Sequence, residues 1–129
     1  MPEPPRRKVV LLVDDDADIL LSLGRLVSRL LPEVDFLTAS SGKQGLDVIA
    51  AQRVDIVVSD LRMPDMDGIA FLEEAKRRVP GILTLMLTAY PSPEVAQDAV
   101  KRGGVILLVT KPFDPAYFVK VLDAISNGR

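Results

Sequence analysis

The sequence predicts a doubly wound α/β fold, in which a five-stranded parallel sheet of order 2-1-3-4-5 carries helices on both faces. The first observation is the length, because 129 residues suit one compact domain with its own core. The second is a set of five short apolar runs, typical of parallel strands that are covered on both faces. The third is the regular alternation of these runs with five segments of helical periodicity. Right-handed crossovers place such helices on both faces, and the flavodoxin-like (βα)5 arrangement is the common five-stranded solution.

Each predicted strand is a run of four or five mainly apolar residues. The five runs are Val9–Val13, Phe36–Ala39, Ile56–Ser59, Leu83–Leu87 and Val105–Val109. Their length favours strands over helices, which usually need ten residues or more.

The first two predicted helices combine a helical apolar period with clear boundary residues. The first helix places six apolar residues on one face and ends before Pro32. These six are Ile19, Leu20, Leu23, Leu26, Val27 and Leu30. The second helix begins after Ser41, a favourable N-cap residue. Its inward residues are Leu46, Ile49 and Ala50.

The remaining three predicted helices are bounded by glycine and proline. The third opens at Gly68, stops before Pro80 and buries Ile69, Leu72, Ala75 and Val79. The fourth has Ser92 as its N-cap and Pro93 as its first residue, and it ends at Gly103-Gly104. The fifth follows Pro115 and buries Phe118, Val121, Leu122 and Ile125.

The composition excludes several kinds of chemistry. The chain has no cysteine and no histidine, which excludes disulfides, thiolate and imidazole metal ligands, and Cys-His or Ser-His catalysis. With 16 basic and 18 acidic residues the net charge is −2, and tryptophan is absent. We therefore expect no direct nucleic-acid binding by this domain. Carboxylates, lysine and hydroxyl groups remain as the candidates for chemistry.

The ends of the chain set the expected domain boundaries. The early apolar run Val9–Val13 is too short for a signal peptide or a membrane span, which favours a cytoplasmic protein without membrane contact. The proline-rich residues 1–7 suggest a disordered leader. We predict one domain over residues 8–126, followed by a tail or the start of a linker at 127–129.

Polar residues follow four of the predicted strands at their carboxyl ends. Strand one is followed by Asp14, Asp15 and Asp16, strand three by Asp60, strand four by Thr88 and strand five by Thr110-Lys111. Parallel strands bring their carboxyl ends to one edge of the sheet, so these groups should share a pocket. Asp16, with Asp18 after it, also suits a plain capping role at the first helix. One cap uses one aspartate, so capping does not explain the whole acidic run.

The predicted cluster of carboxylates suggests a cation. Two carboxylates about 4 Å apart repel by roughly 4 kcal/mol at an effective dielectric of 20. Oxygen ligands without histidine or cysteine favour Mg²⁺, with Mn²⁺ as a substitute, over zinc. A metal held by few carboxylates has positions left for a phosphoryl group, to which Lys111 and Thr88 add a positive charge and a donor. These groups suit phosphoryl transfer.

Four motifs in this order resemble the receiver domain of two-component response regulators. They are Asp14-Asp15 after the first strand, Ser59-Asp60 continuing to Met63-Pro64-Asp65-Met66-Asp67-Gly68, Thr88-Ala89, and Lys111-Pro112-Phe113. The resemblance covers essentially residues 8–125. It implies a regulatory domain that catalyses only its own phosphorylation and dephosphorylation, rather than an enzyme with a separate substrate.

The resemblance assigns a role to each site residue. Asp60 would be the phosphoacceptor, taking a phosphoryl group from a sensor histidine kinase or a histidine phosphotransfer protein. Asp15, Asp60 and the main-chain carbonyl of Arg62 would bind Mg²⁺ directly, and Asp14 would act largely through water. Thr88 would hydrogen-bond the phosphoryl group and Lys111 would pair with it. The Lys111-Pro112 peptide would be cis.

The resemblance also implies an output surface. Phosphorylation would change the face formed by helix 4, strand 5 and helix 5, which could also form a homodimer. One position departs from the family: Leu108, three residues before the lysine, stands where Tyr or Phe is usual. This departure removes the aromatic ring that acts as the usual switch. Arg62 and Tyr90 occupy variable positions that tune phosphoryl lifetime in the family.

Three alternative functions remain open from the sequence. A phosphatase of the haloacid-dehalogenase type would use the Asp14-x-Asp16 pattern, but it needs a later acidic pair that Asp114 and Asp123 are too widely separated to form. A flavodoxin-like binding module would need a phosphate-binding loop where this chain has three negative charges. A degenerate receiver would serve only as a docking surface, although every expected catalytic position is occupied.

Overall fold

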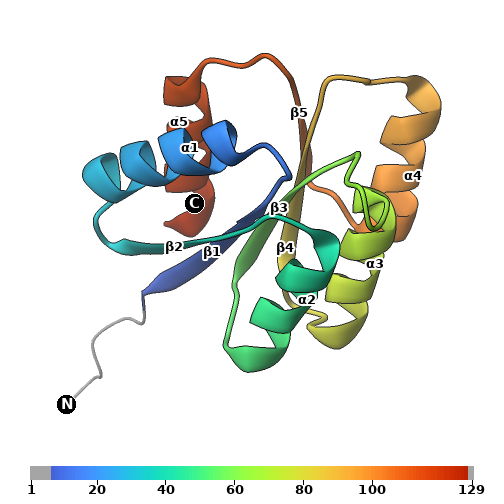
Figure 1. The fold of residues 1–129 in the computed structure, drawn as a ribbon, viewed down its shortest axis with the longest axis horizontal. Helices are drawn as coiled ribbons and strands as arrows, with labels where there is room; N and C mark the ends of the chain where they lie inside the picture. Colours follow the sequence, from blue (N-terminus) through green and yellow to red (C-terminus); the bar gives the residue numbers. More distant parts are fainter. Residues whose placement is uncertain (1–6, 128–129) are drawn as a thin grey trace.

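The computed structural model describes residues 7–127, in which five strands alternate with five helices (Figure 1). The strands are β1 (Lys8–Val13), β2 (Val34–Ala39), β3 (Ile56–Asp60), β4 (Leu83–Thr88) and β5 (Leu107–Thr110). The helices are α1 (Ala17–Leu30), α2 (Gly42–Ala51), α3 (Gly68–Arg78), α4 (Pro93–Gly103) and α5 (Pro115–Ser126). All strand pairs are parallel and the order is β2-β1-β3-β4-β5, so the predicted fold is confirmed.

The predicted domain boundaries, at residues 8 and 126, stay a prediction. Most of the expected leader, residues 1–6, and the last two residues of the expected tail, 128–129, lie outside the described residues. Across residues 7–127, no helix combines the length and the apolar character needed to cross a membrane.

Two apolar cores lie on opposite faces of the sheet. In Figure 1, α1 and α5 cover one face and α2, α3 and α4 cover the other. The alternating residues Leu11 and Leu12 of β1 point into the two cores and are both fully buried. Burying a leucine side chain stabilises the fold by about 1.5–3 kcal/mol. Strands β1, β3 and β4 all have apolar residues that face both cores. The near-continuous apolar character of these strands follows from this double burial.

The predicted helix caps are confirmed. The side chains of Asp16, Ser41 and Ser92 accept hydrogen bonds from backbone N–H groups in the first turns of α1, α2 and α4. Helix α4 ends at Gly103, and the next residue, Gly104, is its C-cap, with a φ of 63° in the left-handed region that glycine adopts without strain.

Three details of the predicted packing are wrong. Leu30 is 50% exposed, because α1 ends at this residue. The next residue, Leu31, has a non-helical backbone, and its side chain turns inward and is only 5% exposed. Ala50 is exposed, because α2 presents Gly42, Gly45 and Ile49 to the core. Strand β5 begins at Leu107 rather than at Val105, whose N–H instead bonds to Ala99 O at the end of α4.

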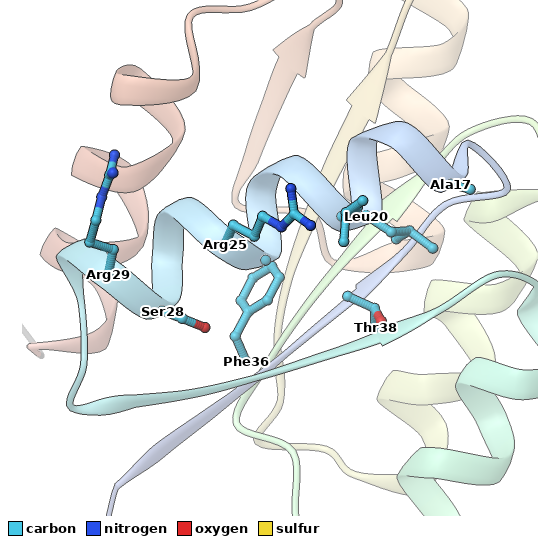
Figure 2. A pocket seen from close by; sticks show the side chains of 9 residues that line it. Ala17, Leu20, Arg25, Ser28, Arg29, Phe36 and Thr38 are labelled. Carbon is cyan, nitrogen blue, oxygen red and sulfur yellow. The ribbon is translucent and has the colours of Figure 1, made fainter.

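A hollow of about 770 Å³ lies between α1 and β2 (Figure 2). Its floor includes Phe36 of β2, and Leu20, Gly24 and Arg25 of α1 form part of its wall. Gly24 lies in the middle of α1, and the absence of a side chain at this position contributes to the hollow. The lining residues do not include any member of the acidic cluster described next.

Candidate functional site

Parallel pairing brings the carboxyl ends of four strands to the same edge of the sheet. Val13 at the end of β1 pairs with Ser59, and Asp60 follows at the end of β3. On the other side, Thr88 at the end of β4 pairs with Thr110 at the end of β5. Asp14, Asp60, Thr88 and Lys111 therefore all lie at this edge, as the sequence predicts.

Three carboxylates form the centre of the site. Asp14, Asp15 and Asp60 each offer an oxygen atom, and these atoms lie within 4.8 Å of one another. Asp14 is fully buried, Asp60 is half-buried and Asp15 is exposed, so the cluster opens to solvent on one side. A set of oxygen donors without nitrogen or sulfur fits a hard cation such as Mg²⁺.

Lys111 partly neutralises the cluster from the β5 side. Its Nζ donates to Asp14 Oδ2 at 2.8 Å and lies 3.4 Å from Asp60 Oδ1. Burial lowers the pKa of Lys111, but the hydrogen bonds and charges of Asp14 and Asp60 outweigh burial and hold that pKa above its ordinary value. The ammonium group is therefore charged at neutral pH and faces both carboxylates.

Asp60 differs electrostatically from an ordinary surface aspartate. Burial raises the pKa of Asp60, and the negative charge of Asp14 raises it further. Lys111 and the Leu61 N–H, which donates to Asp60 Oδ1 at 2.9 Å, only partly oppose this rise. The Asp60 carboxylate is thus destabilised in its charged form, and a cation or a bond to an electrophile would relieve it.

Thr88 and Tyr90 form the β4 side of the site. Thr88 is fully buried, and its Oγ1 accepts a hydrogen bond from Tyr90 N at 2.9 Å. A hydroxyl that accepts in this way still has its own O–H donor, which could serve an incoming oxygen. The exposed Tyr90 ring packs against Arg62, whose Cζ lies 4.5 Å from the ring centroid. This stacking joins the β3–α3 loop to the β4–α4 loop at the mouth of the site.

The β3–α3 loop is held closely against Asp60. Arg62 and Asp67 form an isolated antiparallel bridge, and Gly68 N donates to Leu61 O at 2.7 Å. A side chain at Gly68 would overlap the backbone carbonyl of Asp60. Gly68 therefore allows α3 to start directly against the end of β3.

Some predicted features are now visible, and others were missed. The Lys111-Pro112 peptide is cis, as expected, and Asp16 serves as the N-cap of α1. The Arg62–Tyr90 stacking was not predicted, since the two residues are 28 positions apart and no periodic pattern joins them. The contact of Asp65 with α2 was also missed, because a side chain that caps a distant helix leaves no local signal.

A half-buried lysine beside an acidic cluster, at the carboxyl edge of a doubly wound sheet, fits a phosphoacceptor regulatory domain rather than a classical enzyme. Residues 10–123 match the family described as "Response regulator receiver domain", and the chain belongs to this family of two-component signalling domains. The phosphatase and flavodoxin-like alternatives are therefore wrong.

Two relatives and one solved structure show the range of the similarity. The chain is 40% identical over 115 residues to the transcriptional regulatory protein GlrR of Escherichia coli, which covers 88% of this chain and 25% of the relative. It is 34% identical over 123 residues to the DNA-binding transcriptional regulator NtrC of Klebsiella pneumoniae, covering 95% and 26%. A signal receiver domain of an HD domain-containing protein from Pseudomonas fluorescens has a TM-score of 0.88 and 28% identity, covering 98% of this chain and 92% of that one. The chain thus spans about a quarter of the length of these curated relatives.

The family gives the acidic cluster its meaning. Asp14, Asp15 and Asp60 form a pocket consistent with a phosphoacceptor site and typical of the Mg²⁺ site of receiver domains. A receiver domain also implies a histidine kinase as its partner.

Proposed function

We propose that Asp60 is the phosphoacceptor, and that it takes a phosphoryl group from a phosphohistidine on a sensor kinase or a histidine phosphotransfer protein. An Asp60 carboxylate oxygen forms a bond to phosphorus while the bond between phosphorus and the imidazole nitrogen breaks. The electron pair stays on the imidazole, and the product is an acyl phosphate. The single observation that carries this proposal is the convergence of Asp60 with Asp14, Asp15 and Lys111 at one edge of the sheet.

The residues around Asp60 fit a bound Mg²⁺ ion. Asp15, Asp60 and the main-chain carbonyl of Arg62 would hold it directly, and the more deeply buried Asp14 would act through water. Bound at this site, Mg²⁺ would neutralise the charge that develops on the phosphoryl oxygens; Mn²⁺ offers the same chemistry. Burial, followed by the negative charge of Asp14, raises the pKa of Asp60, and a bound cation would offset both effects, which supports this proposal.

Two further side chains would act on the phosphoryl group itself. The Lys111 ammonium would pair with a phosphoryl oxygen while it keeps its hydrogen bond to Asp14. The Thr88 hydroxyl would donate its free proton to another oxygen. Charge-assisted hydrogen bonds of this kind are about twice as strong as neutral ones, which would favour a shift of the β4–α4 loop on phosphorylation.

The output surface would be the face formed by α4, β5 and α5. Val100 of α4, Ile106 just before β5 and Tyr117 of α5 are large apolar side chains exposed to solvent on these elements. They support a homodimer through this face, or a contact with an output partner. The signalling role would be a cytoplasmic one. The net charge of −2 supports a domain that does not itself bind nucleic acid or an anionic membrane surface.

Intact mass spectrometry with acetyl phosphate and Mg²⁺ tests the assignment. Wild type should gain one phosphoryl group, and Asp60→Asn should gain none. Asp18→Asn is the matched control, because Asp18 is an exposed aspartate outside the cluster, and it should label like wild type. Equal labelling of wild type and Asp60→Asn would refute the assignment. A wild type that does not label at all would favour the receiver that serves only as a docking surface.

A further inference from the structure

The β3–α3 loop is attached to a helix that the phosphoacceptor site does not otherwise use. The carboxylate of Asp65 accepts a hydrogen bond from Gly42 N at 3.1 Å and another from Lys43 N at 2.8 Å. These N–H groups belong to the first two residues of α2, where no partner within the helix exists. The Lys43 N–H, followed by that of Gly42, lowers the pKa of Asp65, so the contact is made by a carboxylate ion at neutral pH.

The neighbouring residue strengthens the same attachment. Met66 packs against the core between α2, α3 and the sheet, and a side chain at Gly42 would lie 2.5 Å from its Sδ. Glycine at position 42 therefore lets the loop approach the helix. Two hydrogen bonds to Asp65 and the apolar contact of Met66 hold the β3–α3 loop on the N-terminus of α2.

The other side of the loop leads directly to the site. The Arg62–Asp67 bridge closes the loop, and Asp67 caps α3 by accepting from Ile69 N at 2.6 Å. Only two residues, Met63 and Pro64, separate Arg62 from Asp65. The main chain of Arg62 is thus held between α2 on one side and the end of β3 on the other.

Helix α2 does not depend on Asp65 alone for its N-terminus. Ser41 Oγ accepts from Gln44 N at 3.1 Å, the third residue of the helix, whereas Asp65 takes the first two N–H groups. Both side chains cap α2, but of the two only Asp65 belongs to the β3–α3 loop and connects that loop to the helix. This division lets capping and positioning be separated by experiment.

We propose that Asp65 is a positioning residue that sets the Arg62 main-chain carbonyl for Mg²⁺ by holding the β3–α3 loop on α2. The proposal rests on the proposed function, which takes this carbonyl as a ligand. Removing Asp65 should leave Asp15 and Asp60 in place but free the third ligand to move. Substitutions that disturb the orientation of metal ligands commonly weaken binding about tenfold or more.

The test is a Mg²⁺ titration of four proteins, monitored by two-dimensional NMR. The four are wild type, Asp65→Ala, Asp65→Asn and Ser41→Ala. The amide signals of Asp15, Asp60 and Leu61 report binding, and urea unfolding of the same proteins reports stability. Ser41→Ala and Asp65→Ala should both unfold at a lower urea concentration than wild type, because each loses a cap of α2. Of these two variants, only Asp65→Ala should weaken Mg²⁺ binding, by about tenfold. Asp65→Asn keeps one acceptor oxygen, so its affinity should lie between those of wild type and Asp65→Ala.

Each result bears on the proposal in a distinct way. Unchanged Mg²⁺ affinity in Asp65→Ala would overturn it, and so would an equal loss in Ser41→Ala, because capping alone would then explain the effect. If Asp65→Ala does not fold, the Asp65→Asn titration decides in the same way. A wild type that does not bind Mg²⁺ would refute the metal site of the proposed function, and this inference would fall with it.

Discussion

Lys111 Nζ donates to Asp14 Oδ2 at 2.8 Å, and this hydrogen bond joins residues 97 positions apart. Asp14 is completely buried and the Lys111 side chain is only 16% exposed. A buried carboxylate needs such a partner, because water no longer solvates its charge. Lys111 therefore stabilises the fold of the unphosphorylated chain and is also part of the site. A substitution of Lys111 is expected to disturb both the fold and the site.

Lys111→Met should accordingly destabilise the chain without phosphate. Removing one partner of a buried ion pair costs about 3 kcal/mol, and the residual exposure of Lys111 places the expected loss near 2 kcal/mol. Urea unfolding at neutral pH measures it. Lys120→Met is the matched control: Lys120 is exposed on α5, and its loss should change stability by less than about 0.5 kcal/mol. Equal stabilities of Lys111→Met and wild type would contradict the prediction.

Asp60→Asn should have the opposite effect on stability. The raised pKa of Asp60 means that its ionised form destabilises the fold, so a neutral amide of the same shape should stabilise the apo chain at pH 7 by on the order of 1 kcal/mol. Asn also keeps an acceptor for Leu61 N. As the pH falls toward the ordinary carboxyl value of 3.8, wild-type Asp60 takes up its proton and the advantage of the variant should disappear.

Urea unfolding of both proteins between about pH 4 and pH 8 tests this dependence. The difference in unfolding free energy should increase with pH through the pKa of Asp60 and then level off. A difference that is constant over this range, or an Asp60→Asn variant that is less stable at pH 7, would show that Asp60 is not destabilised by its surroundings.

Mg²⁺ should raise the stability of wild type by mass action. The unfolded chain has no assembled cluster, so Mg²⁺ at about ten times its dissociation constant should add about 1.4 kcal/mol. Asp15→Ala should remove most of this gain, because Asp15 is one of the three clustered carboxylates. Relief of repulsion could also stabilise this variant without metal. Thermal unfolding with and without Mg²⁺ measures the effect. Asp18→Ala should keep the full gain, and a wild type insensitive to Mg²⁺ would count against the site.

Two helical glycines should respond in opposite directions to alanine. A Cβ at Gly24 in α1 would lie 4.0 Å from Phe36 Cδ2, an ordinary contact, so Gly24→Ala should gain about 0.5–1 kcal/mol from helix propensity. A Cβ at Gly45 in α2 would lie 2.8 Å from Phe71 Cε1, so Gly45→Ala should lose about 1–3 kcal/mol through overpacking. Urea unfolding measures the stability of both variants, and each variant serves as the control for the other. A loss in Gly24→Ala would show that the hollow beside Phe36 is closed to added atoms.

The sequence predicts the strands and the site for the same physical reason. Burial on both faces makes the strands apolar, so polar groups at their ends, such as Asp14 and Asp60, stand out. The contacts that position the site are different. Asp65 caps a helix that begins 23 positions earlier, and Arg62 stacks on Tyr90 of another loop. Such contacts depend on where loops lie in space, which periodicity and capping rules do not describe. Leu30 shows a smaller limit, because the helical period cannot tell where the last turn unwinds.

Leu108 departs from the aromatic residue that the family usually has, and this changes what phosphorylation can move. Its side chain is half-buried and packs against the core between α2, α3, α4 and the sheet. In β5 it pairs with Met86, whose side chain is fully buried. Leucine has less volume than tyrosine and has neither a ring nor a hydroxyl to exchange between water and a carbonyl.

Activation should therefore be transmitted mainly by the β4–α4 loop and α4. A phosphoryl group would draw Thr88 toward it through a charge-assisted hydrogen bond, which would disturb the Thr88–Tyr90 contact and the loop beyond it. Two-dimensional NMR with and without beryllofluoride should show large shifts over residues 89–100 and smaller ones over residues 107–109. Asp60→Asn, which removes the proposed attachment point, should show neither. A change of the Leu108 rotamer that follows activation in methyl spectra would contradict the prediction, because leucine would then perform the switch itself.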